Sequence, residues 1–126
     1  MKRLALAFSI LLILILYTWF AEKFVLNFCK EIDTMLETCA TEILEEKYSQ
    51  AMSTVSNLYD SWEENDILMS ILIGDSSVVE PQKSIVAIYM SFKDENYDEC
   101  LVTIRECQGY VHEIIESNRT SFGNVL

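Results

Sequence analysis

The sequence predicts an all-α protein in which an N-terminal transmembrane helix is followed by a four-helix bundle made of two αα-hairpins. Three observations support this fold class. The 126 residues include only 3 Gly and 1 Pro, too few for the many turns of a β-sandwich or a loop-rich enzyme. An uncharged, mostly apolar run occupies residues 4–21. After it, apolar residues recur at steps of three and four, which is the period of one helix face.

The apolar run from Leu4 to Ala21 predicts a membrane anchor over residues 1–21. A helix of this length spans roughly 27 Å, close to the thickness of a bilayer's hydrocarbon core. The run ends in the aromatic-rich stretch 17–20 (YTWF), and aromatic side chains favour the membrane–water interface. A cleaved signal peptide is the alternative, although its apolar core is shorter and is followed by small residues. A buried core helix is disfavoured because no other segment is long and apolar enough to cover it.

The charges that flank the run predict its orientation. Lys2 and Arg3 precede it, whereas Glu22 and Lys23 follow it and cancel. By the positive-inside rule, the N-terminus stays in the cytoplasm. We therefore expect a single-pass protein of a plasma membrane whose helical domain is extracytoplasmic.

One helical domain at residues 22–117 and a C-terminal tail at residues 118–126 make up the rest of the predicted organisation. The whole chain carries 9 basic and 20 acidic residues, a net charge of −11. This balance argues against nucleic-acid binding and against attraction to anionic lipid headgroups. The acidic surface predicts solubility, with attraction to a basic partner or to cations as the alternative.

The first helix of the bundle is expected to continue directly out of the anchor, because no residue there breaks it. An acidic turn follows at residues 46–47, and a second helix is expected over residues 48–73. A break or bend at 63–66 stays open, since Asp66 falls near the apolar stripe. Gly74 then ends the helix as a left-handed cap. The inward positions of these two helices are Val25, Phe28, Ile32, Leu36, Cys39, Ile43, Tyr48, Ala51, Met52, Val55, Leu58, Tyr59 and Trp62.

The third helix is expected to begin near Ser77, which has Glu80 as a capping-box partner, or with Pro81 at the first helical position. Asp75 and Ser76 are further cap candidates. Its inward positions are Ile85, Ile88, Tyr89 and Phe92.

The fourth helix follows a turn at residues 94–96, with Asn96 as its N-cap and Glu99 completing a capping box. It has the clearest apolar stripe of the chain: Tyr97, Cys100, Leu101, Ile104, Cys107, Val111, Ile114 and Ile115. The tail after it contains three apolar residues that are expected to fold back onto the bundle: Phe122, Val125 and Leu126.

The two halves of the domain resemble each other at an offset of 49 residues. Each half is a helix, a short acidic turn, an aromatic residue and a second helix, which is the plan of an αα-hairpin repeat of the tetratricopeptide kind. Chance alignment of two amphipathic pairs is the alternative. Because solenoids need more repeats, we expect a closed four-helix bundle and not an open groove. The matched pairs are Leu36 with Ile85, Cys39 with Ile88, Ile43 with Phe92, Tyr48 with Tyr97, Met52 with Leu101 and Val55 with Ile104.

The cysteines and the single histidine are predicted to be structural. Cys39, Cys100 and Cys107 lie on apolar stripes, where cysteine behaves as a small hydrophobic residue. Together with Cys29 they form no Cys-x-x-Cys motif, which excludes zinc-ribbon and thioredoxin-type sites. A disulfide between helices, such as Cys39 with Cys100, is the alternative. His112 has no second histidine with which to form a metal-binding pair.

The remaining polar motifs indicate no chemistry, so we predict no catalytic, cofactor-binding or metal-binding residue. The acidic pairs at 45–46, 63–64 and 94–95 lie in turns or on exposed faces, whereas acid–base catalysis needs carboxylates in a cleft. The sequence has no glycine-rich phosphate loop and no serine nucleophile motif. Residues 118–120 (NRT) fit a glycosylation acceptor, a motif that is common by chance.

Several of these features together resemble a family of short Gram-positive bacterial proteins, the domain-of-unknown-function family numbered 4363. They are the Lys-Arg start, the N-terminal span, the acidic helical stretch and the polar end at 124–126 (NVL). Trp62, the helix end at 73–75 (IGD) and the acidic turn before Tyr97 also match. Lys47-Tyr48 and Asn96-Tyr97 depart from the Gly- or Asp-led turns expected there. The resemblance covers nearly the whole chain, implies a single-pass membrane protein that is helical outside the membrane, and transfers no site residues.

The function predicted from these observations is docking. We expect a non-enzymatic accessory module that binds membrane lipid through Leu4 to Ala21 and binds another membrane protein, without nucleic acid. Tyr59, Trp62 or Tyr89 are the expected anchors of the docking face, because aromatic side chains dominate interfaces. Assembly with a second copy stays open. The alternative is a ligand-sensing helical bundle without its own output domain.

Overall fold

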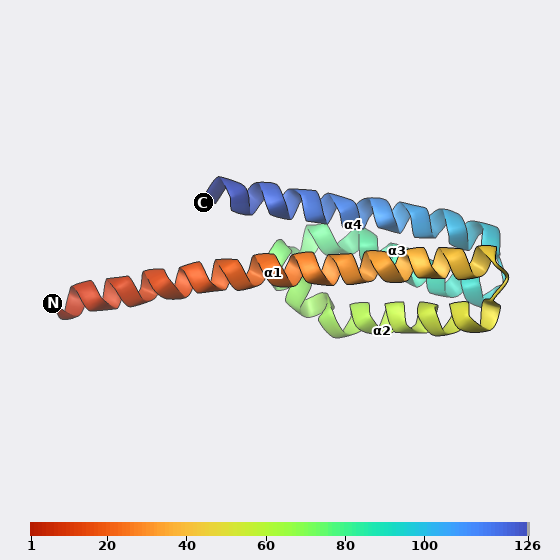
Figure 1. Ribbon diagram of the computed structural model, residues 1–126, viewed down its shortest axis with the longest axis horizontal. Coiled ribbons are helices and arrows are strands. Elements are labelled where there is room, and N and C mark those ends of the chain that lie inside the picture. The colour runs from red at the N-terminus through yellow and green to blue at the C-terminus, as the bar shows by residue number, and fades with distance from the viewer. Residues whose placement is uncertain (126) are drawn as a thin grey trace.

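The computed structural model describes residues 1–125, with side chains up to Arg119. The described residues form four α-helices: α1 (Lys2–Leu44), α2 (Tyr48–Ile73), α3 (Asp75–Lys93) and α4 (Tyr97–Val125). The predicted all-α fold is therefore confirmed. Figure 1 shows that the second half of α1 packs in the bundle, while its first half projects alone from one end.

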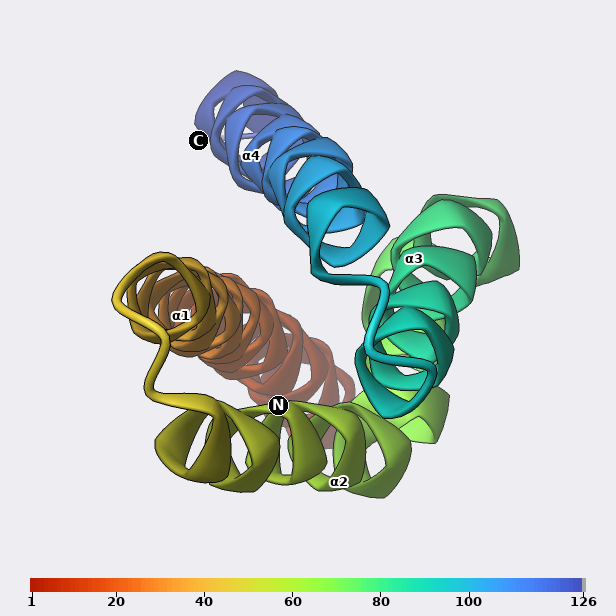
Figure 2. The same cartoon turned by 90° about the vertical axis from the view of Figure 1, so that its right-hand side faces the viewer.

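The four helices form a closed antiparallel bundle. α1 contacts α2 and α4, and α3 contacts the same two helices. Figure 2, which looks along the bundle, shows each helix beside two neighbours. The two αα-hairpins are thus packed against each other, as expected for a chain with too few repeats for a solenoid.

α1 is one continuous helix with two different environments. Its apolar residues before Phe20 are exposed, and those from Ala21 onward form a buried stripe. The stripe meets the inward faces of the other three helices in one hydrophobic core, and each fully buried large side chain contributes about 1.5–3 kcal/mol of transfer free energy. Members of the core include Ile32, Leu36, Leu58, Met69, Ile85, Ile88, Ile104 and Val111.

The backbone of the two hairpin turns repeats at the predicted offset of 49 residues. Glu46 and Glu95 are both in the left-handed region, with φ of 61° and 59°. In each turn, the N–H of this glutamate donates to the carbonyl three residues earlier, at Ile43 or Phe92. Tyr48 and Tyr97, which follow the two turns, stack with ring centroids 4.2 Å apart. The repeat is therefore present in the backbone conformation as well as in the residue pattern.

The cap of α4 is formed as predicted. The Glu99 backbone N–H donates to Asn96 Oδ1 at 3.4 Å, and Asn96 Nδ2 donates to Glu99 Oε2 at 2.8 Å. The equivalent position before α2 is Lys47, which makes no such side-chain cap. The two repeats therefore differ at their helix starts.

The start of α3 differs from the expectation. The helix begins at Asp75, directly after Gly74, so Ser77 is already inside it and Pro81 lies in its second turn. Gly74 has a φ of 93° and a ψ of 151°, which is a glycine-specific extended conformation and not the left-handed cap predicted. This conformation reverses the chain in one residue and leaves no room for a separate capping segment.

α2 has the predicted bounds, whereas α4 is longer than its sequence pattern suggested. α2 passes through residues 63–66 without a break, and its last turns lean away from the line of its first part (Figure 1). Asp66 is only half-buried there, so the helix accommodates its carboxylate without ending. α4 continues beyond Asn118 to Val125, where the tail was expected. The predicted folding back of Phe122, Val125 and Leu126 falls on side chains outside the described ones.

Candidate functional site

The first half of α1 is the most distinctive surface of the molecule. Within the described residues, α1 is the one helix that is long and apolar enough to cross a membrane. Large apolar side chains from Leu4 to Phe20 are about half exposed or more. Soluble proteins rarely expose so large a continuous apolar surface to water. At the end of this segment, Lys23 Nζ lies 5.1 Å from the centre of the Trp19 ring. A tryptophan beside a lysine is typical of the membrane–water boundary.

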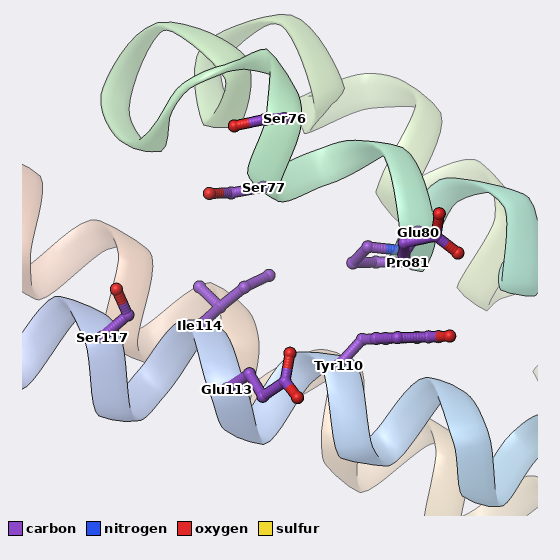
Figure 3. A pocket seen from close by; sticks show the side chains of 8 residues that line it. All are labelled: Ser76, Ser77, Glu80, Pro81, Tyr110, Glu113, Ile114 and Ser117. Atoms are coloured by element: carbon purple, nitrogen blue, oxygen red, sulfur yellow. The ribbon is translucent and has the colours of Figure 1, made fainter.

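A cleft of about 290 Å³ lies between the start of α3 and the second half of α4. Figure 3 shows Ile114 and Ser117 rising from α4 toward α3, with Pro81 facing them, whereas the Glu113 side chain lies across α4. The cleft is open to the surface and is not a cavity of the core. Its lining residues are Ser76, Ser77, Glu80, Pro81, Tyr110, Glu113, Ile114 and Ser117.

The cleft is lined by polar as well as apolar side chains. The Glu113 side chain lines the cleft from α4, and the Glu80 carboxylate points away from α4 (Figure 3). Pro81 has no backbone N–H, so the carbonyl of Ser77 lacks its usual helical donor and can accept from a ligand. No group of three or more His, Cys, Asp or Glu side chains within the described residues is arranged to hold a metal ion.

A second surface runs along the outer side of α3. Val79, Val86 and Met90 are 40%, 41% and 56% exposed, and Lys83 lies among them. We call these four residues the α3 outer face. A shallow hollow of about 390 Å³ is lined by Val79, Lys83 and Val86 together with Gln82. The inward stripe of α3 gives no sign of this face, and the spacing of Val79 and Val86 by seven residues is its one signal in the sequence.

The aromatic residues expected on a docking face are placed differently. Trp62 is 2% exposed and belongs to the core, where its ring centroid lies 5.8 Å from that of Phe28. The expectation that Trp62 anchors a partner is therefore wrong. Tyr59 and Tyr89 are half-buried and pack together across α2 and α3, with centroids 5.1 Å apart. Lys93 Nζ covers the Tyr89 ring at 4.7 Å, so this pair borders the α3 outer face.

All four cysteines are free thiols in the core. Burial raises the pKa of Cys29, Cys39 and Cys107 to about 12 and also raises that of Cys100. A reactive cysteine needs the opposite shift, toward the thiolate. The structure thus places these residues as the predicted core thiols, and the alternative disulfide between Cys39 and Cys100 is not formed.

His112 is an exposed residue of α4 that links to α1. Its Nε2 atom lies 3.2 Å from Asp33 Oδ1, and the imidazole side chain is 61% exposed. Asp33 is also near Cys107, and its negative charge adds to the rise in the pKa of that thiol. The three residues therefore do not form an activated cysteine site, since the charge near the thiol has the wrong sign.

The other polar contacts are structural and mostly exposed. The Gln108 and Arg105 side chains of α4 both donate to Glu37 of α1, and these two hydrogen bonds lower the pKa of the Glu37 carboxyl. The predicted acidic pairs in the turns are exposed. Asn118, the residue of the glycosylation motif, is only 5% exposed, and its Nδ2 donates to the Glu22 carbonyl at 3.4 Å. A glycan on Asn118 is incompatible with this packing.

Comparison with known proteins gives a family without an assigned activity. The model of the domain of unknown function DUF4363 matches residues 19–125. The match begins at the end of the apolar segment and covers all of the helical bundle. No curated protein and no solved structure was found to match the chain.

Proposed function

The chain belongs to the DUF4363 family, and on this premise we propose that it is a non-enzymatic, membrane-anchored module that docks an α-helix of another membrane protein. The observation that carries the proposal is the α3 outer face. Three apolar side chains of this face stay exposed on a helix that is otherwise well packed. Single exposed apolar residues are ordinary on a protein surface, whereas an aligned group marks a contact site.

The spacing of the α3 outer face suits a helical partner. Val79 and Val86 are seven residues apart, and so are Lys83 and Met90. Residues spaced by seven form a nearly straight seam along a helix. From Val79 to Met90 the seam is about 16 Å long, which is three turns of a helix. An amphipathic helix laid along such a seam covers it with residues of matching spacing.

The charges on this face indicate the chemistry of the partner. Lys83 lies within the seam, and Lys93 covers Tyr89 at its far end. These two cations stand out in a chain of net charge −11. Opposite charges across an interface steer encounter and exclude wrong partners. The proposed partner helix therefore carries apolar residues flanked by acidic ones.

The anchor explains why the partner is expected to be a membrane protein. We propose that residues 4–21 span a plasma membrane with the N-terminus in the cytoplasm, because Lys2 and Arg3 precede the span. The bundle then stands outside the membrane, with α3 nearly parallel to α1 (Figure 1). A partner held in the same membrane meets this face without a search in three dimensions, so that modest contacts are sufficient.

Photo-crosslinking in intact cells tests the docking proposal. A benzoylphenylalanine is placed at Val86 in the α3 outer face and, as the matched control, at Val102, which is 59% exposed on α4. We expect one dominant heterologous membrane protein to be captured from position 86 and not from position 102. The substitution Lys83→Glu should then reduce the yield of that adduct, because it reverses the charge that faces the partner.

The proposal fails if both positions give the same adducts or if position 86 gives none. Capture of a second copy alone also contradicts it and assigns the face to self-assembly. A captured protein whose contact region has no helix, or whose adduct yield rises with Lys83→Glu, contradicts the proposed chemistry of the partner.

The cleft between α3 and α4 favours a second candidate function, the sensing of a small polar ligand. The Glu113 carboxylate and the hydroxyl of Ser117 belong to its lining, so a small amine is the ligand class that fits best. Calorimetric titration of the full-length protein with putrescine should show saturable binding that Glu113→Gln abolishes and Glu106→Gln leaves unchanged. If Glu113→Gln and Glu106→Gln give the same heat of putrescine binding, the proposed sensing function is contradicted.

A further inference from the structure

A compact apolar patch occupies the last turns of α2. Ile67, Leu68 and Ile71 are 73%, 36% and 68% exposed. We call these three residues the α2 end patch. They are the largest exposed aliphatic side chains of α2, and they lie at the end of the bundle from which the free half of α1 projects (Figure 1).

The register between the helices places this patch at a definite level along α1. The Trp62 ring of α2 packs on the Phe28 ring of α1. From that contact, the antiparallel helices run in opposite chain directions with a rise of about 1.5 Å per residue. Ile67 is therefore level with Lys23, and Ile71, about 13.5 Å from the contact, is level with Trp19.

The level of α4 follows from a contact of its own. Asn118 of α4 donates to the carbonyl of Glu22 in α1, so this part of α4 also lies near the level of Lys23, and α4 continues for seven residues beyond it to Val125. The patch thus lies between the levels of Trp19 and Lys23.

The same segment of α1 marks the surface of the membrane in the proposed anchor. Trp19 and Lys23 contact each other where the uncharged run ends, and the headgroup layer beyond the hydrocarbon is roughly 5–7 Å thick on each side. A side chain level with this segment is surrounded by lipid headgroups and the first acyl carbons. Isoleucine and leucine gain free energy there by leaving water.

We propose that the α2 end patch inserts into the outer headgroup layer of the membrane, so that the bundle is seated on the bilayer at a second point besides α1. This proposal rests on the anchoring part of the proposed function. A single helix leaves a domain free to rotate and tilt about its exit point. Two points of contact fix the orientation, and they hold the α3 outer face upright toward a partner in the same membrane.

The charges around the patch limit how deep it goes. Glu63 and Glu64 lie about one turn before the patch, Asp66 directly precedes Ile67, and Asp75 follows the patch at the start of α3. Carboxylates are costly in hydrocarbon but are hydrated among headgroups. The patch is therefore expected at the level of the headgroups and glycerol, and the net negative charge favours zwitterionic over anionic lipid.

Fluorescence quenching by lipid measures this seating directly. The full-length protein is labelled with the fluorophore NBD at single introduced cysteines, Ile71→Cys, Ile13→Cys or Val102→Cys, because the four native thiols are buried. Each sample is placed in phosphatidylcholine vesicles containing lipid with a nitroxide near the glycerol for positions 71 and 102, or deep in the acyl chain for position 13, which lies near the middle of the span. We expect loss of fluorescence at positions 13 and 71 and none at position 102, and the reverse with aqueous iodide. Circular dichroism verifies that each labelled chain is helical.

The three positions separate the possible failures. Quenching at position 13 without quenching at position 71 overturns the seating and leaves the anchor intact. Absence of lipid quenching at position 13 contradicts the anchor itself. Protection of position 71 from both quenchers assigns the α2 end patch to a protein contact and also overturns the proposal.

Discussion

Trp62 stabilises the bundle from within, and its indole makes two opposite contributions. The ring is 2% exposed and packs on Phe28, which favours folding through burial of a large apolar surface. The indole N–H, however, is buried without a hydrogen-bond partner among the described residues, and such a donor costs about 1–3 kcal/mol. The apolar stripe of the second helix predicted this inward placement, whereas aromatic character alone also suggested a docking anchor, because aromatic residues are common both in interfaces and in cores.

Substitution of Trp62 tests whether it is a core residue. Trp62→Ala should lower the free energy of unfolding by about 3–5 kcal/mol, the range for loss of a large buried aromatic. Trp62→Phe should be much closer to neutral, because it keeps an aromatic ring and removes the unpaired N–H. Urea unfolding of the full-length protein in detergent, followed by circular dichroism, measures both. Equal and small effects of the two substitutions would place Trp62 at the surface.

The buried thiols make a prediction about reactivity. Because burial raises the pKa of Cys29, Cys39 and Cys107 to about 12, the native protein should react with a thiol reagent only after denaturation. The variant Val102→Cys should react with one equivalent at once and with four more in denaturant. Rapid modification of the unsubstituted protein at pH 8 would contradict the packing of the core.

The same shifts predict how stability depends on alkaline pH. The folded pKa of these thiols lies above the ordinary value of 9.0, so the unfolded chain loses its thiol protons first. The contribution of the thiols to stability is complete below pH 9 and decreases as pH rises from 9 toward 12.

At the scale of elements, the two hairpin turns share a backbone and differ in one cap. Glu46 and Glu95 adopt the same left-handed conformation, but only Asn96 caps the helix that follows its turn. The sequence predicted the offset of 49 residues and the Asn96 cap, because both depend on the types of residues that are close together in the chain. It did not predict that α3 starts at Asp75. That start depends on the ψ of 151° at Gly74, which follows from how the two hairpins pack and not from the local residue types.

Exchange of the two caps tests the repeat. Asn96→Ala should lower the free energy of unfolding by about 0.5–2 kcal/mol, the usual cost of a lost N-cap. Lys47→Asn, at the equivalent position of the first repeat, should raise it by up to about 1 kcal/mol, since Gln50 stands where Glu99 stands in the second. The exposed Lys47–Glu45 pair that is lost is worth little. Destabilisation by Lys47→Asn would show that the two turns are not equivalent.

At the scale of the whole molecule, α1 joins the two parts of the protein. The sequence predicted that this helix runs unbroken from the apolar segment into the bundle, because no residue in it favours a break, and the structure confirms one helix from Lys2 to Leu44. The surface sites were less predictable, because the seven-residue spacing of Val79 and Val86 was their one signal in the sequence. The α3 outer face and the α2 end patch consist of ordinary apolar residues, and only the assembled bundle shows which of them the core leaves exposed.

The sidedness of the bundle is the measurement that tests the account most directly. Cells producing Val102→Cys, or a chain with a cysteine inserted after Met1, are treated with a membrane-impermeant maleimide, while the buried native thiols stay silent. If α1 anchors an extracytoplasmic bundle, the cysteine at position 102 is labelled in intact cells and the N-terminal cysteine only after permeabilisation. The reverse pattern, or recovery of the bundle from the medium without α1, would contradict the account.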